Sequence, residues 1–449
     1  MTVYIILIPG IIALIYAIVR SPEEAFLHVY LPVLFFLPGY YRMILPGFPD
    51  PTFNEAAIIP IFLVYLARGA KGWRFTVTDL FVFGFAFTQG YSQYLSTGYN
   101  DAQNLIFDML GNVVFPYIVA KGMIESSGYR VKFAKKLILV LAIVAVAQAY
   151  EFRFMACPFK MALDPFFPFQ GIGWVTTIRY GFGRAAGPFG HCILAGLILG
   201  FGFRIQRWLQ QNGHWESKRK AQVLTGLMVA GMLMSQARGP QLGAALGSVI
   251  VLIGRAKNRR TMLITVLSLG ILVGTPAYIA FTAYVSVGRA GATSSTQETA
   301  AYRKELMDKY TDIALEKSWW GWGENEWPQV VGMPSIDNHF LNVALRHGLI
   351  AMGCFIMAMF WVAIRLAIYA YKAPPKSEAS TLAFTLLAAL IAVVIAIVTV
   401  YLGLQAQQVL FILIGWSDAL VRQKEHAAVS GATTIDLPQP QFRFKRVLA

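Results

Sequence analysis

The chain has 449 residues, of which 57% are hydrophobic and only 14% are charged. Soluble domains carry roughly a quarter charged residues, so this composition excludes a soluble enzyme and predicts a protein that lies in the lipid bilayer. The formal net charge of +15 does not indicate nucleic-acid binding, because the basic residues collect in connections between apolar runs, where they favour anionic lipid and a cytoplasmic location.

Thirteen apolar runs of near-spanning length follow one another along the sequence. At roughly 20 apolar residues for each span, the length allows about twelve or thirteen transmembrane helices. We expect helices and not a barrel, because no ten-residue alternating pattern appears. Five prolines between Pro32 and Pro51 predict that the second or third run is broken or re-entrant. The runs cover residues 2–19, 25–45, 53–67, 77–96, 102–124, 137–151, 187–205, 221–236, 240–254, 261–284, 344–371, 379–402 and 407–420.

The expected fold is therefore an all-α polytopic membrane protein with two large periplasmic loops. Clusters of lysine and arginine fall on alternate connections, and the positive-inside rule assigns these connections to the cytoplasm. In the second long loop, apolar and aromatic residues recur at helical spacing, which predicts an amphipathic helix over 299–317. The predicted divisions are N-terminal transmembrane helices over 1–151, a periplasmic loop over 152–186, transmembrane helices with the Arg238 turn over 187–284, a large periplasmic loop over 285–343, C-terminal transmembrane helices over 344–424 and a cytoplasmic tail over 425–449.

Two arginines are candidates for chemistry because each stands where a predicted span meets the periplasmic side. Arg184 precedes the sequence Gly-Pro-Phe-Gly-His at 187–191, where free backbone N–H groups and a guanidinium can hold a phosphate. The alternative for Arg184 is a boundary arginine that snorkels to the membrane surface. Arg238 lies in a turn, Gln-Ala-Arg-Gly-Pro at 236–240, against the positive-inside bias, and such a cation favours a functional role.

His339 is the candidate general base, in the sequence 337–342 at the end of the second long loop. Imidazole exchanges protons near neutral pH, and Asp337 is a candidate orienting partner. A lone histidine is more often a hydrogen-bonded structural residue, and the sequence leaves that alternative open.

Trp319, Trp320 and Trp322 form a Trp-Trp-Gly-Trp-Gly run after the predicted amphipathic helix. Aromatic side chains anchor proteins at the lipid headgroups and also stack on sugar rings, so the run predicts either an interfacial anchor or a glycan platform. The outer carboxylates form no paired ligand set for a divalent metal, and no phosphate loop or dinucleotide motif occurs. We therefore expect neither a metal nor a cofactor.

The order of these motifs resembles the O-antigen ligase and O-antigen polymerase superfamily of bacterial membrane glycosyltransferases. The resemblance covers residues 180–370, and the flanking spans resemble the family only in hydropathy. Four pieces carry it: Arg184 with 187–191, the turn 236–240, Tyr302-Arg303 with the tryptophan run, and Asn338-His339-Phe340-Leu341 with Gly348-Leu349-Ile350.

The resemblance implies inverting transfer of a glycan from undecaprenyl diphosphate to an acceptor hydroxyl at the periplasmic side of the bacterial inner membrane. It also implies that Arg184 and Arg238 hold the leaving diphosphate, with Arg303 and Arg289 as further phosphate contacts. His339 would activate the acceptor. That acceptor is lipid A core in a ligase, or a second carrier-linked repeat unit of O-antigen or exopolysaccharide in a polymerase, and the sequence does not decide between them.

A polysaccharide flippase or transporter without transferase chemistry is the alternative class, because it would also be polytopic and basic. Such proteins usually have paired inverted halves with broken helices near the membrane midplane. No half-to-half repeat is visible here, and the polar residues concentrate in the two outer loops. These features favour the transferase.

Overall fold

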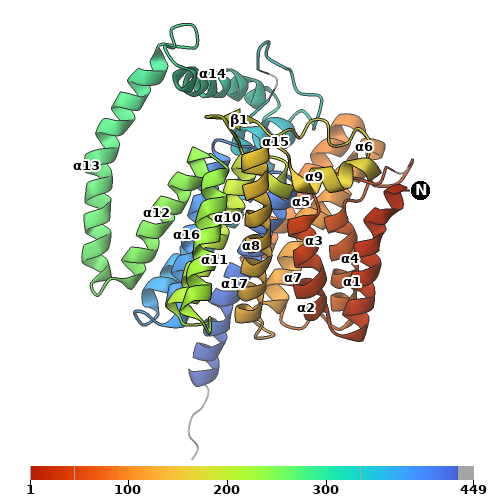
Figure 1. The fold of residues 1–449 in the computed structure, drawn as a ribbon, viewed down its shortest axis with the longest axis vertical. Helices are drawn as coiled ribbons and strands as arrows, with labels where there is room; N and C mark the ends of the chain where they lie inside the picture. Colours follow the sequence, from red (N-terminus) through yellow and green to blue (C-terminus); the bar gives the residue numbers. More distant parts are fainter. Residues whose placement is uncertain (1, 45, 334, 433–449) are drawn as a thin grey trace, which may run out of the picture.

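The computed structural model describes residues 2–44, 46–333 and 335–432, and the described chain is predominantly helical. Most helices stand side by side in one bundle, and α14 lies across the end that carries the long loops (Figure 1). The α-helices are α1 Ile8–Val19, α2 Pro22–Ala25, α3 Leu31–Phe36, α4 Phe53–Ala67, α5 Val77–Thr97, α6 Tyr99–Met109, α7 Phe115–Met123, α8 Arg130–Phe154, α9 Pro158–Leu163, α10 Cys192–Gln211, α11 Lys218–Met234, α12 Arg238–Arg255, α13 Arg259–Ser286, α14 Ser295–Glu316, α15 His339–Lys372, α16 Glu378–Ile397 and α17 Leu404–Ala432. Short 3₁₀ segments lie at Thr2–Leu7, Asp164–Phe166 and Gly187–Phe189, π-helical segments at Phe26–Tyr30 and Leu110–Val114, and an antiparallel hairpin consists of β1 Ile178–Arg179 and β2 Phe182–Gly183.

The two ends of the bundle carry different connections. The loop end carries the long segments 155–191 and 287–338. The basic end carries the short connections 212–217, 256–258 and 373–377, which are flanked by lysine or arginine. Helices α10, α12 and α15 run from the loop end to the basic end, and α11, α13 and α16 return. The fold thus contains the alternation of long and basic connections that the sequence predicts.

Each of the thirteen predicted apolar runs overlaps a helix or a series of helical segments, which confirms the all-α polytopic fold. Within the described residues, six helices are long and apolar enough to cross a membrane, and two shorter apolar helices accompany them. The exact number of spans therefore stays a prediction. The second run is the broken one: α3 ends at Phe36 because Leu37, which precedes Pro38, is extended. Of the predicted tail 425–449, α17 includes the part up to Ala432, and the remainder lies outside the described residues.

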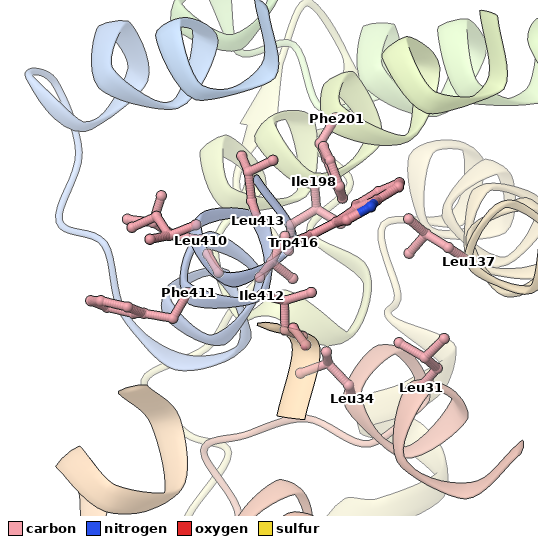
Figure 2. Close-up of a cluster of buried hydrophobic side chains, with 14 of the residues drawn as sticks. Leu31, Leu34, Leu137, Ile198, Phe201, Leu410, Phe411, Ile412, Leu413 and Trp416 are labelled. Atoms are coloured by element: carbon pink, nitrogen blue, oxygen red, sulfur yellow. The ribbon is translucent and has the colours of Figure 1, made fainter. Parts of the chain in front are cut away.

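Helix α17 supplies the centre of the hydrophobic core. Its residues Ile412, Leu413 and Trp416 face side chains of α3, α8 and α10, including Leu34, Leu137 and Ile198 (Figure 2). Trp416 is fully buried, and its indole N–H donates to the Glu125 carboxylate at 2.7 Å. The core is thus assembled from helices that are far apart in sequence.

A cluster of buried charges joins four helices in the interior. Lys121 of α7 pairs with Asp79 of α5 and, at 2.9 Å, with Asp418 of α17. Arg365 of α15 reaches the other oxygen of Asp418 at 2.7 Å. Charges inside a membrane protein are tolerated when they are paired, so this cluster fixes the relative positions of these helices.

Small residues allow α12 and α16 to approach closely. A Cβ atom on Gly243 would lie 3.0 Å from the Ala392 carbonyl oxygen, and one on Gly247 would lie 3.1 Å from that of Ala388. The Gly-x-x-x-Gly spacing of α12 is typical of such contacts, because glycines let two helix backbones come close.

Helix α13 stands apart from the rest of the bundle (Figure 1). Only Arg259 and Val285, near its two ends, are buried. The Arg259 guanidinium donates to the carbonyl oxygens of Tyr371 and Ala373 at 3.0 Å, which holds the start of α13 against the end of α15. The apolar residues of α13 between Arg259 and Val285 are not buried by protein, so they face the lipid of the bilayer.

Helix α15 is kinked at Gly348, so residues 339–347 form a short separate helix at the loop end. Gly348 has φ 81° and ψ 175°, a conformation that favours glycine. The Leu349 N–H donates to the Ser318 carbonyl oxygen at 2.7 Å, and the Trp322 N–H donates to that of Leu345 at 3.0 Å. The tryptophan run therefore packs directly against the kink.

We expect Gly348→Ala to destabilise the protein. The positive φ alone costs roughly 1–3 kcal/mol for a residue with a side chain, and the new methyl group would overlap the Trp319 carbonyl oxygen. Gly353→Ala is the control, because this glycine of α15 has open space around it and ordinary helical geometry. Melting temperatures in detergent should fall for the first variant and not for the second. Equal melting temperatures would show that the kink does not depend on glycine.

Candidate functional site

Four arginines line one cavity at the loop end, and we call it the arginine cavity. It has a volume of about 590 Å³ and contains Arg179, Arg184, Arg238 and Arg303. Arg179 belongs to β1, Arg184 follows β2, Arg238 begins α12 and Arg303 lies on α14. The structure thus brings together three of the predicted phosphate-binding residues and adds Arg179.

The β1–β2 hairpin holds two of these arginines in place. Its turn residues Tyr180 and Gly181 have φ values of 54° and 77°, as in the two-residue turns that suit the twist of a hairpin. The Arg184 N–H donates to the Thr177 carbonyl oxygen at 2.7 Å. The Arg179 guanidinium donates to the Gln236 carbonyl oxygen at 2.9 Å, which ties the hairpin to the turn before Arg238.

No acidic side chain lines the arginine cavity, and the nearby carboxylate of Asp337 interacts with Arg303 without forming an ion pair. Among the described residues, no ion pair includes any of its four arginines. The Nε atoms of Arg184 and Arg303 are buried without a hydrogen-bond partner, and burial lowers the pKa of Arg184, with a further contribution from Arg179. An anion with several oxygen atoms would satisfy these donors.

A second, polar cavity of about 350 Å³ contains His339, and we call it the histidine cavity. Two ion pairs line it. Arg42 binds Asp108 through two hydrogen bonds of 2.9 and 2.8 Å, and Arg346 lies 3.5 Å from Glu324. Burial raises the pKa of Glu324, and Arg346 opposes that shift. The other polar and aromatic side chains of the lining are Thr52, Asn54, Gln89, Asp101, Asn104, Asn112, Trp174, Asn342, His347, Tyr401, Gln407 and Gln408.

The imidazole of His339 is held by backbone and aromatic neighbours. It is 3% exposed, and its Nδ1 accepts a hydrogen bond from the Leu402 N–H at 3.3 Å. Its ring packs against Phe355 and Tyr401, with centroids 5.0 and 5.4 Å away, and Nε2 has no partner. The neutral ring therefore carries its proton on Nε2. The described residues show no hydrogen bond between Asp337 and His339, so the orienting group is the Leu402 backbone.

The two cavities share one short piece of chain, residues 398–403 between α16 and α17. Thr399 lines the arginine cavity, Tyr401 lines the histidine cavity, and Leu402 bonds to His339. Arg184 and Arg238 line one cavity, and His339 lines the neighbouring one. Asp337 is half-buried and belongs to neither lining: burial raises its pKa, and Arg303 opposes that shift.

The tryptophan run is mainly a packing element. The Trp322 indole donates to the Ile313 carbonyl oxygen at 2.9 Å, and Trp320 lies edge-on to Tyr91 at 4.8 Å. Ser96 of α5 donates to the Trp322 carbonyl oxygen at 2.6 Å. Trp319 is 69% exposed. Of the predicted glycan platform, only Trp319 presents an open aromatic face.

Arg289 lies outside the arginine cavity lining. Its guanidinium lies 5.2 Å from the centre of the Tyr302 ring and is exposed. Sequence reasoning missed Arg179, for which a second arginine five residues before Arg184 was the available signal. It also missed the Arg42–Asp108 pair, which no local pattern reveals because 66 residues separate the two partners.

Residues 223–356 match the family model described as O-antigen ligase, a region that includes Arg238, Arg303 and His339. No curated protein matches the chain. The matched part is similar to the O-antigen ligase family and carries Arg238, Arg303 and His339, which supports a relation of this all-helical chain to the O-antigen ligase and polymerase superfamily.

Proposed function

We propose that the protein transfers a glycan from undecaprenyl diphosphate to an acceptor hydroxyl on the periplasmic side of the inner membrane. The observation that carries this proposal is the arginine cavity: four arginines with no ion-pair partner among the described residues, at the end of the bundle that carries the long loops. The basic connections at the opposite end support the orientation, because the positive-inside rule assigns them to the cytoplasm.

The cavity suits the diphosphate of a carrier that stays in the membrane. Phe281 and Tyr284 of α13 line it, and the rest of α13 faces lipid. A polyprenyl tail can therefore remain in the bilayer while its diphosphate reaches Arg184 and Arg238. The diphosphate gains charge as its bond to the sugar breaks, so arginines that are already in position stabilise the transition state more than the ground state.

We place the saccharides in the histidine cavity, whose ion pairs and amides offer donors and acceptors for sugar hydroxyls. The acceptor oxygen attacks the anomeric carbon, the bond from that carbon to the diphosphate oxygen breaks, and His339 takes the acceptor proton. His339 Nδ1 accepts a hydrogen bond from the Leu402 N–H, so the ring proton is on Nε2. His339 can act as a base at Nε2 only after this hydrogen bond has opened and the ring proton has moved to Nδ1.

A deletion strain tests the proposal and identifies the acceptor. Loss of surface glycan with accumulation of carrier-linked polymer would identify a ligase acting on lipid A core. Single repeat units in place of polymer would identify a polymerase acting on a second carrier-linked unit. Surface glycan of normal amount and length would contradict the proposal, and carrier-linked glycan trapped on the cytoplasmic side would indicate a flippase.

We expect transfer to need no divalent metal, because the arginines supply the positive charge that the leaving diphosphate requires. The described residues contain no group of three or more His, Cys, Asp or Glu side chains placed to hold a metal ion. Purified protein should therefore transfer carrier-linked glycan at the same rate with and without EDTA. Activity that EDTA abolishes and Mg²⁺ or Mn²⁺ restores would refute this expectation.

A further inference from the structure

A third cavity lies at the basic end of the bundle, far from the site described above. It has a volume of about 400 Å³ and is lined by α10, α11, α12 and α16. Arg204, Arg207 and Arg255 line it together with apolar side chains, and its lining contains no acidic residue. The cavity is therefore positively charged and partly apolar.

Two side chains that line this cavity carry buried donors without partners. Arg204 is only 5% exposed, its Nε has no hydrogen-bond partner, and its guanidinium lies 4.3 Å from the centre of the Phe203 ring. Trp208, which also lines the cavity, is 1% exposed and its indole N–H is likewise unpartnered. No ion pair in the described part of the chain includes Arg204, Arg207 or Arg255. Buried donors of this kind are normally satisfied, so an oxygen-rich anion is the missing partner.

The depth of the cavity matches the headgroup layer of a bilayer. Arg204 lies seven residues before the end of α10 at Gln211, and Ser248 lies seven residues before the end of α12 at Arg255. At 1.5 Å per residue, the cavity extends about 10 Å inward from the helix ends. Leu252 of its lining is 56% exposed on α12, so an apolar surface continues outward from the charged centre.

We propose that this cavity binds the phosphate headgroup of an anionic phospholipid, with the acyl chains along the exposed face of α12. Basic pockets between transmembrane helices recognise such headgroups. The arginines and the indole donate to the phosphate oxygens, and Val251 and Leu252 contact the chains. A soluble anion would use the charge but not the apolar lining. This inference does not depend on the transfer reaction.

The test measures lipid retention by native mass spectrometry and the melting temperature of the full-length protein in detergent. Delipidated protein receives phosphatidylglycerol, cardiolipin, phosphatidylethanolamine or inorganic phosphate. We expect the two anionic lipids to bind and raise the melting temperature. Arg204→Gln should weaken that binding roughly tenfold or more, because charge-assisted hydrogen bonds are lost.

Two further variants keep the result interpretable. The double variant Arg207→Gln with Arg255→Gln leaves the buried Arg204 in place, so it tests the site even if Arg204→Gln does not fold, and it should also weaken binding. Arg219→Gln is the matched control, because it removes one charge from an exposed position at the same end. Equal losses in this control, equal binding of phosphatidylethanolamine, or inorganic phosphate that binds as well as lipid would each overturn the proposal.

Discussion

Arg238→Ala should lower carrier binding and glycan transfer together, with a fall in kcat/KM of roughly 10²–10³-fold. Arg238 lines the arginine cavity with Arg179 and Arg184, and its Nη2 donates to the Tyr180 hydroxyl at 3.3 Å. The diphosphate is negative before transfer and more negative during it, so both KM and kcat should change. Arg238→Lys should recover part of the loss, because it keeps the charge but not the two-pronged guanidinium.

Arg289→Ala is the matched control for this result. Arg289 also lies at the loop end of the bundle, but its side chain is exposed against Tyr302 and does not line the arginine cavity. Its alanine variant should bind carrier and transfer glycan at near wild-type rates. If it loses as much activity as Arg238→Ala, or if Arg238→Ala keeps its affinity for the carrier, the diphosphate does not bind in this cavity.

The helices were predictable because membrane spans leave a strong local signal. Each run of apolar residues contains helix, and α4, predicted at 53–67, begins where Thr52 and Glu55 form a capping box. The amphipathic helix predicted over 299–317 is α14, and its buried residues Leu306 and Tyr310 pack against Trp327. Local periodicity was sufficient for these elements.

The site was only partly predictable because its parts meet through tertiary packing. Arg184 and Arg238 stood out as cations at span ends on the side where cations are rare, and they do share a cavity. The sequence did not reveal the role of the tryptophans, because the same residue type stacks on sugar rings and packs against other side chains. In the structure, the Trp322 N–H donates to the Leu345 carbonyl oxygen beside the kink at Gly348. This contact holds Trp322 against the short helix that carries His339.

His339→Ala should lower turnover by roughly 10²–10⁴-fold while carrier binding stays nearly intact. His339 lines the histidine cavity and not the arginine cavity, so removing its ring should leave the diphosphate contacts of Arg184 and Arg238 in place. Rapid-quench transfer with saturating carrier measures the chemical step. A carrier-binding measurement on the same preparation shows whether affinity is retained.

His339→Gln decides whether the imidazole takes a proton or only donates a hydrogen bond. In the structure Nδ1 accepts from Leu402, which leaves the proton on Nε2, so the ring is arranged to donate into the cavity. Glutamine can donate from a similar position but has no basic nitrogen. If His339 is the base, the glutamine variant should be as slow as the alanine variant. If glutamine restores most of the turnover, His339 is a donor, and Asp337, whose pKa burial raises, becomes the candidate base that Asp337→Asn would test.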